Sequence, residues 1–160
     1  ASFEARCQSG DIGECTPDKL NALKGDLSDS RPKIIMPLAG TPTSEIGSAN
    51  FDGAKVPVLM MSGTLDESGQ SDVMSVVKSV EITWVNVENG CHQLYGLGNS
   101  VLGDEACKAL PDEEGFSLVN PWILAYARYH VWQDRTPFVA DLIEQRSSLS
   151  PKIAVQHFGP

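Results

Sequence analysis

The pattern of hydrophobic and polar positions along the chain predicts three β-strands. Residues 56–61 form an apolar run without polar alternation, which is typical of a strand buried on both faces of a parallel sheet. Residues 81–87 alternate polar and apolar side chains and are rich in β-branched and aromatic types, so they predict another strand. The apolar segment 32–39 predicts a strand that precedes both.

Helical spacing of apolar residues predicts four helices. A short one spans 17–24, where Thr16 is placed to cap it, and a second spans 68–79. The strongest helix opens at Asn120-Pro121, and Thr136-Pro137 ends that helix and starts the last one. Strands and helices together indicate an α/β fold.

This order of elements predicts a single domain over residues 1–160. A polar segment held by a disulfide occupies 1–32, the strands and helices of the core occupy 33–146, and a tail occupies 147–160. Three parallel strands do not make a stable doubly wound sheet. We therefore expect the sheet to be completed either by strands from another polypeptide or by a missing amino-terminal half of a larger fold.

The composition narrows the class of protein. The chain has 160 residues, 41% of them hydrophobic and 21% charged, which suits one globular domain that buries about 68–70% of its unfolded surface. The net charge of −9 would repel nucleic acids and anionic membrane surfaces. No apolar run is long enough to span a membrane. The expected ligand is therefore small or neutral.

The four cysteines allow three disulfide pairings, of which we expect the local one, Cys7–Cys15 with Cys91–Cys107. The loop between Cys7 and Cys15 has almost no apolar content to hold it in place. A disulfide would supply that constraint and indicates an oxidising compartment, so we expect a secreted or periplasmic protein. Zinc is the alternative, but no CxxC spacing is present and the histidines lie far from the first two cysteines. We expect no metal and no cofactor.

Two polar residues follow the predicted buried strands directly. Gly63 breaks the first of these strands and delivers Asp66 to the loop at its carboxyl end, and the next strand ends at Gly90, Cys91 and His92. Ligands of open α/β sheets bind at that edge. A carboxylate and an imidazole that arrive there from adjacent strands predict a catalytic pair, to which another group must supply the nucleophile.

The order of these motifs resembles the carboxyl-terminal half of a serine α/β-hydrolase. The segment 33–39, the strand before Asp66, the turn before His92 and the helix from Pro121 follow one another as in that superfamily, over roughly residues 30–135. Within it, the chain looks most like the secreted branch near dienelactone hydrolases and platelet-activating-factor acetylhydrolases. The resemblance implies a doubly wound hydrolase sheet, with Asp66 and His92 as the acid and base of a catalytic triad.

The chain departs from that superfamily in its nucleophile. Such enzymes carry their serine in a G-x-S-x-G turn upstream of the acid, and the 160 residues contain no such pentapeptide. The resemblance therefore implies a partner, an amino-terminal hydrolase chain bearing G-x-S-x-G, and a small or polymeric ester as substrate. The alternative is a non-catalytic module that keeps the half-fold as a binding or structural subunit.

Three other residues are weighed for a role in chemistry. His130 lies in the middle of the predicted long helix, where we expect it to pack or to lie at the surface, and His157 lies in the expected tail. Cys91 could be a nucleophile, but adjacent residues on an extended turn point apart. A disulfide to Cys107 that stiffens the loop around His92 is the expected role of Cys91.

Overall fold

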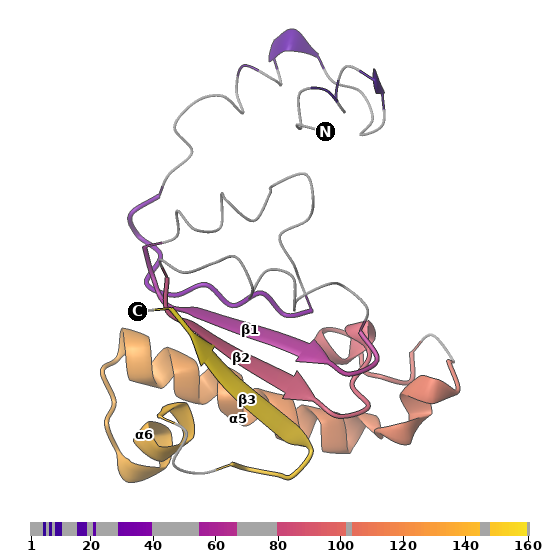
Figure 1. The fold of residues 1–160 in the computed structure, drawn as a ribbon, viewed down its shortest axis with the longest axis vertical. Coiled ribbons are helices and arrows are strands. Elements are labelled where there is room, and N and C mark those ends of the chain that lie inside the picture. Colours follow the sequence, from indigo (N-terminus) through magenta and orange to yellow (C-terminus); the bar gives the residue numbers. More distant parts are fainter. Residues whose placement is uncertain are drawn as a thin grey trace.

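A three-stranded sheet organises the described part of the chain (Figure 1). The computed structural model describes residues 5, 7, 9, 10, 16–18, 21, 29–39, 55–66, 80–101, 104–144 and 148–159. The strands are β1 (Val58–Gly63), β2 (Ile82–Val87) and β3 (Ile153–Phe158), in that order across the sheet. β1 and β2 are parallel, whereas β3 is antiparallel to β2. The fold is therefore α/β with a mixed sheet.

The segment expected to be the first strand runs parallel to β1 without forming a regular strand. Isolated bridges join Ile35 to Val58 and Leu38 to Met61. The Ile35 N–H donates to the Pro57 carbonyl at 3.0 Å, and the Pro37 carbonyl accepts from Met61 at 3.1 Å. Pro37 has no N–H to offer between these bonds, so the ladder is interrupted at that residue. Residues 33–39 thus lie along the edge of β1 as an extended segment.

Two helices follow the paired strands. α5 (Asp112–Val131) runs along one face of the sheet, and α6 (Pro137–Ile143) packs against α5 (Figure 1). Thr136 precedes α6 and Pro137 is its first residue, which confirms the start predicted for the last helix. Two short 3₁₀ helices, η1 (His92–Tyr95) and η2 (Ala106–Ala109), lie between β2 and α5.

Each face of the sheet contributes its side chains to a separate hydrophobic cluster. Side chains of β1 and β2 alternate between the faces. Leu59, Met61 and Val85 pack with Trp122 and Tyr126 of α5. The other cluster contains the alternate positions of the same strands together with Trp84 and Phe158. All six residues of β1 are buried, as its uninterrupted apolar run predicts.

The long helix begins earlier than the sequence pattern predicts. α5 starts at Asp112, and Pro121 lies inside it instead of at its first turn. Pro121 has no N–H for the carbonyl one turn earlier, but the flanking turns are held by Leu118, Val119 and Trp122, which are buried. Three acidic residues in the first turn of α5 favour its amino terminus through the helix dipole. Packing of these turns in the core therefore carries the helix through a proline that the sequence pattern places at its start.

The segment 147–160, predicted to be a tail, contains β3. β3 lies at a sheet edge. Within it Ile153 is buried, Val155 and Phe158 are half-buried, and the other three residues are exposed. Its weak apolar signal explains why the strand was missed. His157, assigned to the tail, lies opposite Thr83 in the register, and its Nδ1 is 3.1 Å from the Thr83 hydroxyl.

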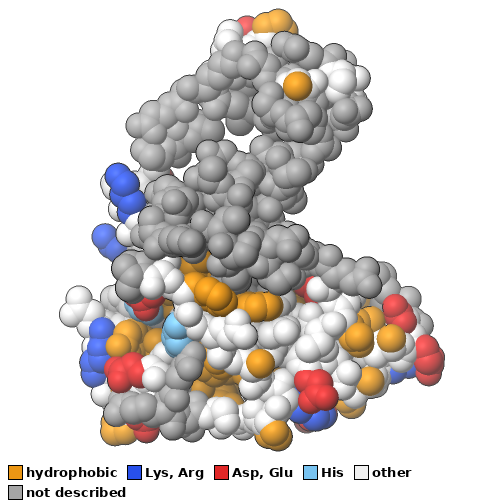
Figure 2. All heavy atoms as spheres, in the orientation of Figure 1, with side chains coloured by type: hydrophobic (Ala, Val, Ile, Leu, Met, Phe, Trp, Pro, Cys, Tyr) orange, Lys and Arg blue, Asp and Glu red, His pale blue; other side chains and the backbone are white. Residues whose placement is uncertain are grey.

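Some predicted elements fall outside the described residues. These are the helix at 68–79, Cys15, and most of the helix at 17–24, of which Pro17, Asp18 and Asn21 are described and helical. On the face shown in Figure 2, the described Lys and Arg side chains stand in small separate groups, several of them beside acidic ones. None of the described helices combines the length and apolar character that crossing a bilayer requires.

His130 of α5 is enclosed by aromatic rings. Its imidazole is 4.3 Å from the Tyr126 ring and 5.0 Å from the Tyr129 ring, centroid to centroid, and its side chain is 10% exposed. Burial lowers the pKa of His130 below its ordinary value of 6.5; Glu81 opposes this shift and Arg135 adds to it. His130 therefore packs in a neutral form.

This burial predicts an acid-sensitive fold. A histidine with a lowered folded-state pKa binds more protons when unfolded, so its contribution is fully present above pH 6.5 and falls as the pH drops below that value. The free energy of unfolding of the wild type should fall as the pH is lowered from about 7 to 5. We expect His130→Phe to make this slope shallower, by at most about 1.4 kcal/mol per pH unit. Denaturant titrations at several pH values measure this free energy. Near pH 8 it should depend least on pH in both proteins. Equal slopes of the free energy against pH for the variant and the wild type would contradict the prediction.

Candidate active site

The turns that follow β1 and β2 lie together because these two strands are parallel and in register. The Thr64 N–H donates to the Val87 carbonyl at 3.0 Å, and the Leu65 N–H donates to the Gly90 carbonyl at 3.0 Å. The Asp66 N–H closes its own turn on the Gly63 carbonyl at 3.0 Å. These bonds bring the two sequence-predicted residues, Asp66 and His92, to one edge of the sheet.

The turn after β1 requires a glycine at Gly63, because its backbone closely approaches the backbone of the second turn. A Cβ on Gly63 would lie 1.9 Å from the Gly90 carbonyl oxygen, a distance that no side chain tolerates. The positive φ of the second turn falls on Asn89, at 58°, and the Asn89 N–H donates to the Thr64 hydroxyl at 2.8 Å. A Cβ on Gly90 would lie 3.1 Å from the Gly63 Cα, so Gly90 also leaves space for this approach.

Asp66 and His92 form a hydrogen-bonded pair. The His92 Nδ1 lies 3.3 Å from the Asp66 Oδ1. The Asp66 side chain is 3% exposed and the His92 side chain is 62% exposed. A buried carboxylate beside Nδ1 favours the tautomer that carries a proton on that nitrogen, so Nε2 is left as an acceptor. The pair can therefore take a proton from a hydroxyl group that approaches the exposed ring.

A polar cavity of about 510 Å³ opens beside this pair. It is formed by the turn after β1, the start of η1 and η2. Its described lining residues are Thr64, Leu65, Asp66, Cys91, His92, Gln93, Asp104, Ala106 and Cys107. No serine is among these described residues, so the nucleophile expected from the resemblance is not part of the described wall.

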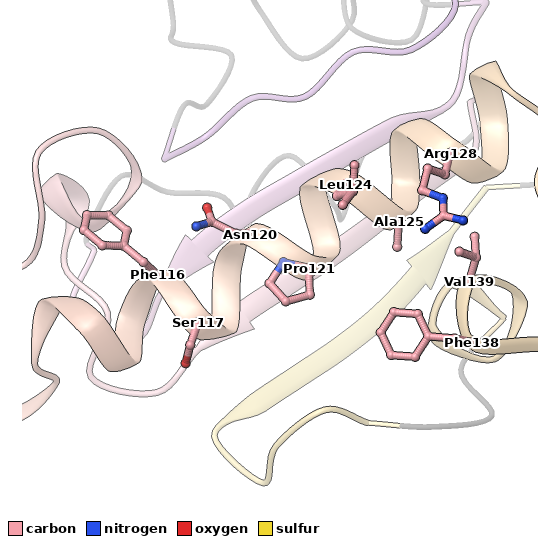
Figure 3. A pocket seen from close by; sticks show the side chains of 9 residues that line it. All are labelled: Phe116, Ser117, Asn120, Pro121, Leu124, Ala125, Arg128, Phe138 and Val139. Carbon is pink, nitrogen blue, oxygen red and sulfur yellow. The ribbon is translucent and has the colours of Figure 1, made fainter.

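The described residues also line a larger, apolar cavity of about 570 Å³ between α5 and α6 (Figure 3). Leu124 and Phe138 on its wall are 54% and 58% exposed. It shares no lining residue with the cavity at His92. Its one charged lining residue, Arg128, is hydrogen-bonded through Nε to Asp134 at 2.7 Å. This wall offers no acid and base pair, so the smaller cavity is the candidate active site.

Tyr95 is a residue near the site that the sequence pattern did not single out. It ends η1, one 3₁₀ turn after His92. Its hydroxyl is buried and has no hydrogen-bond partner among the described residues. Burial, and secondarily the negative charge of Asp66, raise the pKa of the Tyr95 hydroxyl. Tyr95 therefore stays neutral beside the candidate acid.

A disulfide joins Cys91 to Cys107, as predicted, with Cα atoms 5.8 Å apart. It links the residue before His92 to η2, and the described residues contain no free thiol. The alternative in which Cys91 acts as a nucleophile is therefore wrong. Cys7 is also in a disulfide, and its expected partner, Cys15, lies outside the described residues.

Loss of this disulfide should destabilise the fold. The bond joins residues 16 positions apart, and closing a loop of that length contributes about 3 kcal/mol by restricting the unfolded chain. We expect the double variant Cys91→Ser with Cys107→Ser to lose free energy of unfolding of that order in denaturant titrations. A double variant that unfolds at the same denaturant concentration as the wild type would contradict this role.

Metal chemistry finds no support in the described residues. None of their His, Cys, Asp and Glu side chains form a group of three that could hold a metal ion. Zinc, the alternative weighed for the cysteines, is further disfavoured because Cys91 and Cys107 are joined to each other.

Comparison with known proteins adds no family assignment. No family model, curated protein or solved structure matches the chain. The chemistry of the site therefore rests on its own geometry.

Proposed function

We propose that this chain supplies the acid and the base of a Ser-His-Asp triad in a carboxylic-ester hydrolase, whose serine comes from polypeptide outside these 160 residues. One observation carries the proposal. A buried carboxylate, Asp66, is hydrogen-bonded to the exposed imidazole of His92 at the carboxyl edge of two parallel strands. Enzymes of the α/β-hydrolase class, which the chain resembles, have their acid and histidine at that edge.

The proposed reaction uses each of these groups in a defined way. His92 Nε2 takes the proton of the serine hydroxyl while the serine oxygen bonds to the ester carbonyl carbon. His92 then gives this proton to the departing alcohol. Water attacks the acyl-serine by the same route, so that a carboxylic acid leaves and the serine is regenerated. Asp66 remains ionised throughout and stabilises the imidazolium that forms at each step.

The sheet edge at residues 33–39 is a place where another polypeptide could add a strand, which favours the proposal of a partner chain. In this segment the backbone groups of Ile35 and Pro37 face β1, so those of the alternate residues point the other way. The side chains of Ile35 and Leu38 are 37% and 36% exposed. An additional strand along this edge would extend the sheet and lead to the nucleophile. We propose that this polypeptide is an amino-terminal hydrolase chain bearing G-x-S-x-G.

The surroundings of the site fit a small or polymeric ester as substrate and a secreted or periplasmic setting. The cavity at His92 has a polar wall, and the net charge of −9 disfavours nucleic acids and anionic membranes as ligands. The Cys91–Cys107 disulfide suits an oxidising compartment.

The intact mass and sequence of the native particle test this arrangement. We expect the native particle to contain a G-x-S-x-G sequence in a companion chain that remains bound during purification. A native particle made only of these 160 residues, folded cooperatively, would contradict the proposal and favour the non-catalytic binding module.

A further inference from the structure

Asn99 is a buried amide in the loop that follows η1, and its side chain holds several backbone segments together. The residue is 1% exposed. Its Oδ1 accepts a hydrogen bond from the Cys91 N–H at 2.7 Å. Its Nδ2 donates to the carbonyl oxygens of Asn89 at 2.9 Å and Cys107 at 2.7 Å, and lies 3.2 Å from that of Leu110. One side chain thus serves groups on both sides of Gly90 and on both sides of the disulfide.

The chemistry of the amide explains why asparagine suits this place. Its oxygen accepts and its NH₂ group has two hydrogens, so the two shorter contacts take them and the Leu110 contact is the weakest. A flipped amide would set NH₂ against the Cys91 N–H and an oxygen against three carbonyl oxygens. The orientation is therefore unique, and the loss of the amide would leave buried backbone groups without partners.

The loop that carries Asn99 is itself attached to the start of α5. The Ser100 N–H donates to Asp112 Oδ1 at 3.0 Å, and the Ser100 hydroxyl donates to Asp112 Oδ2 at 2.5 Å. Gly98 has a φ of 101°, and a Cβ on it would lie 2.8 Å from the Asp112 carboxyl carbon. These contacts place the Asn99 amide relative to a helix that packs on the sheet.

We infer that Asn99 is a positioning residue for His92, which it holds through the backbone of the preceding residues. The Asn89 carbonyl and the Cys91 N–H belong to the two peptide units on either side of Gly90, just before His92, and Asn99 binds both. The disulfide restrains Cys91 only through its side chain, so the amide adds an independent restraint on the backbone. The expected effect on catalysis rests on the proposed function, whereas the restraint of the backbone before His92 does not depend on it.

The first test is a comparison of variants in the native particle. Asn99→Ala should lower kcat for ester hydrolysis by up to about 100-fold, the loss that a displacement of about 1 Å brings, with little change in KM. Ile143→Ala is the control, because Ile143 is also buried, at 3% exposure on α6, and none of the hydrogen bonds described above joins it to residues 89–110. At equal folded fraction the control should keep its kcat.

A readout that does not depend on activity separates this inference from the proposed function. The imidazole Nδ1–H resonance of His92, hydrogen-bonded to Asp66, should be lost or broadened in Asn99→Ala and kept in Ile143→Ala. If His92→Ala retains esterase activity, the proposed function fails, yet this resonance still decides the role of Asn99. An unchanged resonance in Asn99→Ala, or an equal loss in both variants, would overturn the inference.

If Asn99→Ala does not fold, amide hydrogen exchange of the unaltered protein tests whether Asn99 restrains the backbone at Cys91. Cys91 belongs to no strand or helix, so an unrestrained N–H there would exchange quickly. The bond to Asn99 predicts exchange at least about 100-fold slower than that of an unprotected loop amide. Fast exchange at Cys91 would show that the amide does not hold this backbone, and would overturn the inference.

Discussion

Replacing His92 by alanine is expected to abolish ester hydrolysis by the native particle. His92 is the residue whose imidazole opens onto the cavity, with Asp66 bonded to its Nδ1. Without it the serine hydroxyl has no acceptor for its proton, and loss of the triad histidine costs about 10⁶-fold in kcat. Hydrolysis of a chromogenic ester, with circular dichroism to verify folding, provides the measurement.

The control for this variant is His130→Ala. His130 lies among the rings of Tyr126 and Tyr129, away from the residues that line the cavity at His92. Its loss should cost little activity at neutral pH under conditions where the protein remains folded. If His92→Ala hydrolyses the ester at the wild-type rate, the catalytic account fails and the binding-module account stands.

Asp66→Asn should leave the fold intact and lower kcat by up to about 10⁴-fold. The asparagine would fill the same buried space, since the Asp66 side chain is 3% exposed. Its NH₂ group, however, would favour a His92 tautomer with the proton on Nε2, which cannot take a proton from serine. The charge that stabilises the imidazolium would also be lost.

Glu88→Gln is the matched control for Asp66→Asn, because it makes the same chemical change at the same end of the sheet. Glu88 is exposed in the turn after β2 and does not line the cavity. Steady-state kinetics and thermal unfolding of both variants separate catalytic from structural effects. Equal rates for Asp66→Asn and Glu88→Gln would contradict the role of Asp66.

Strands β1 and β2 and the positions of Asp66 and His92 after them were predictable from the sequence, because they follow from short-range patterns. The unbroken apolar run of β1 indicates burial on both faces, and all of its residues are buried. The parallel pairing of β1 and β2 then brings Asp66 and His92 to one edge, where they are hydrogen-bonded.

The features that the sequence did not predict depend on contacts between distant segments. β3 is an edge strand whose stability comes from its ladder with β2, and its alternating polar positions conceal it. α5 continues through Pro121 because its flanking turns are packed on the sheet. The role of Asn99 depends on backbone groups of residues 89–110, which no local pattern brings together.

The measurement that tests the central claim most directly is covalent labelling of the native particle with a fluorophosphonate probe. An activated serine oxygen bonds to the phosphorus of this probe and displaces fluoride, and a general base must take the serine proton. The account predicts a label on a G-x-S-x-G serine outside these 160 residues, and its loss in His92→Ala. Labelling that is absent from the wild-type particle, or that persists undiminished in His92→Ala, would contradict the account.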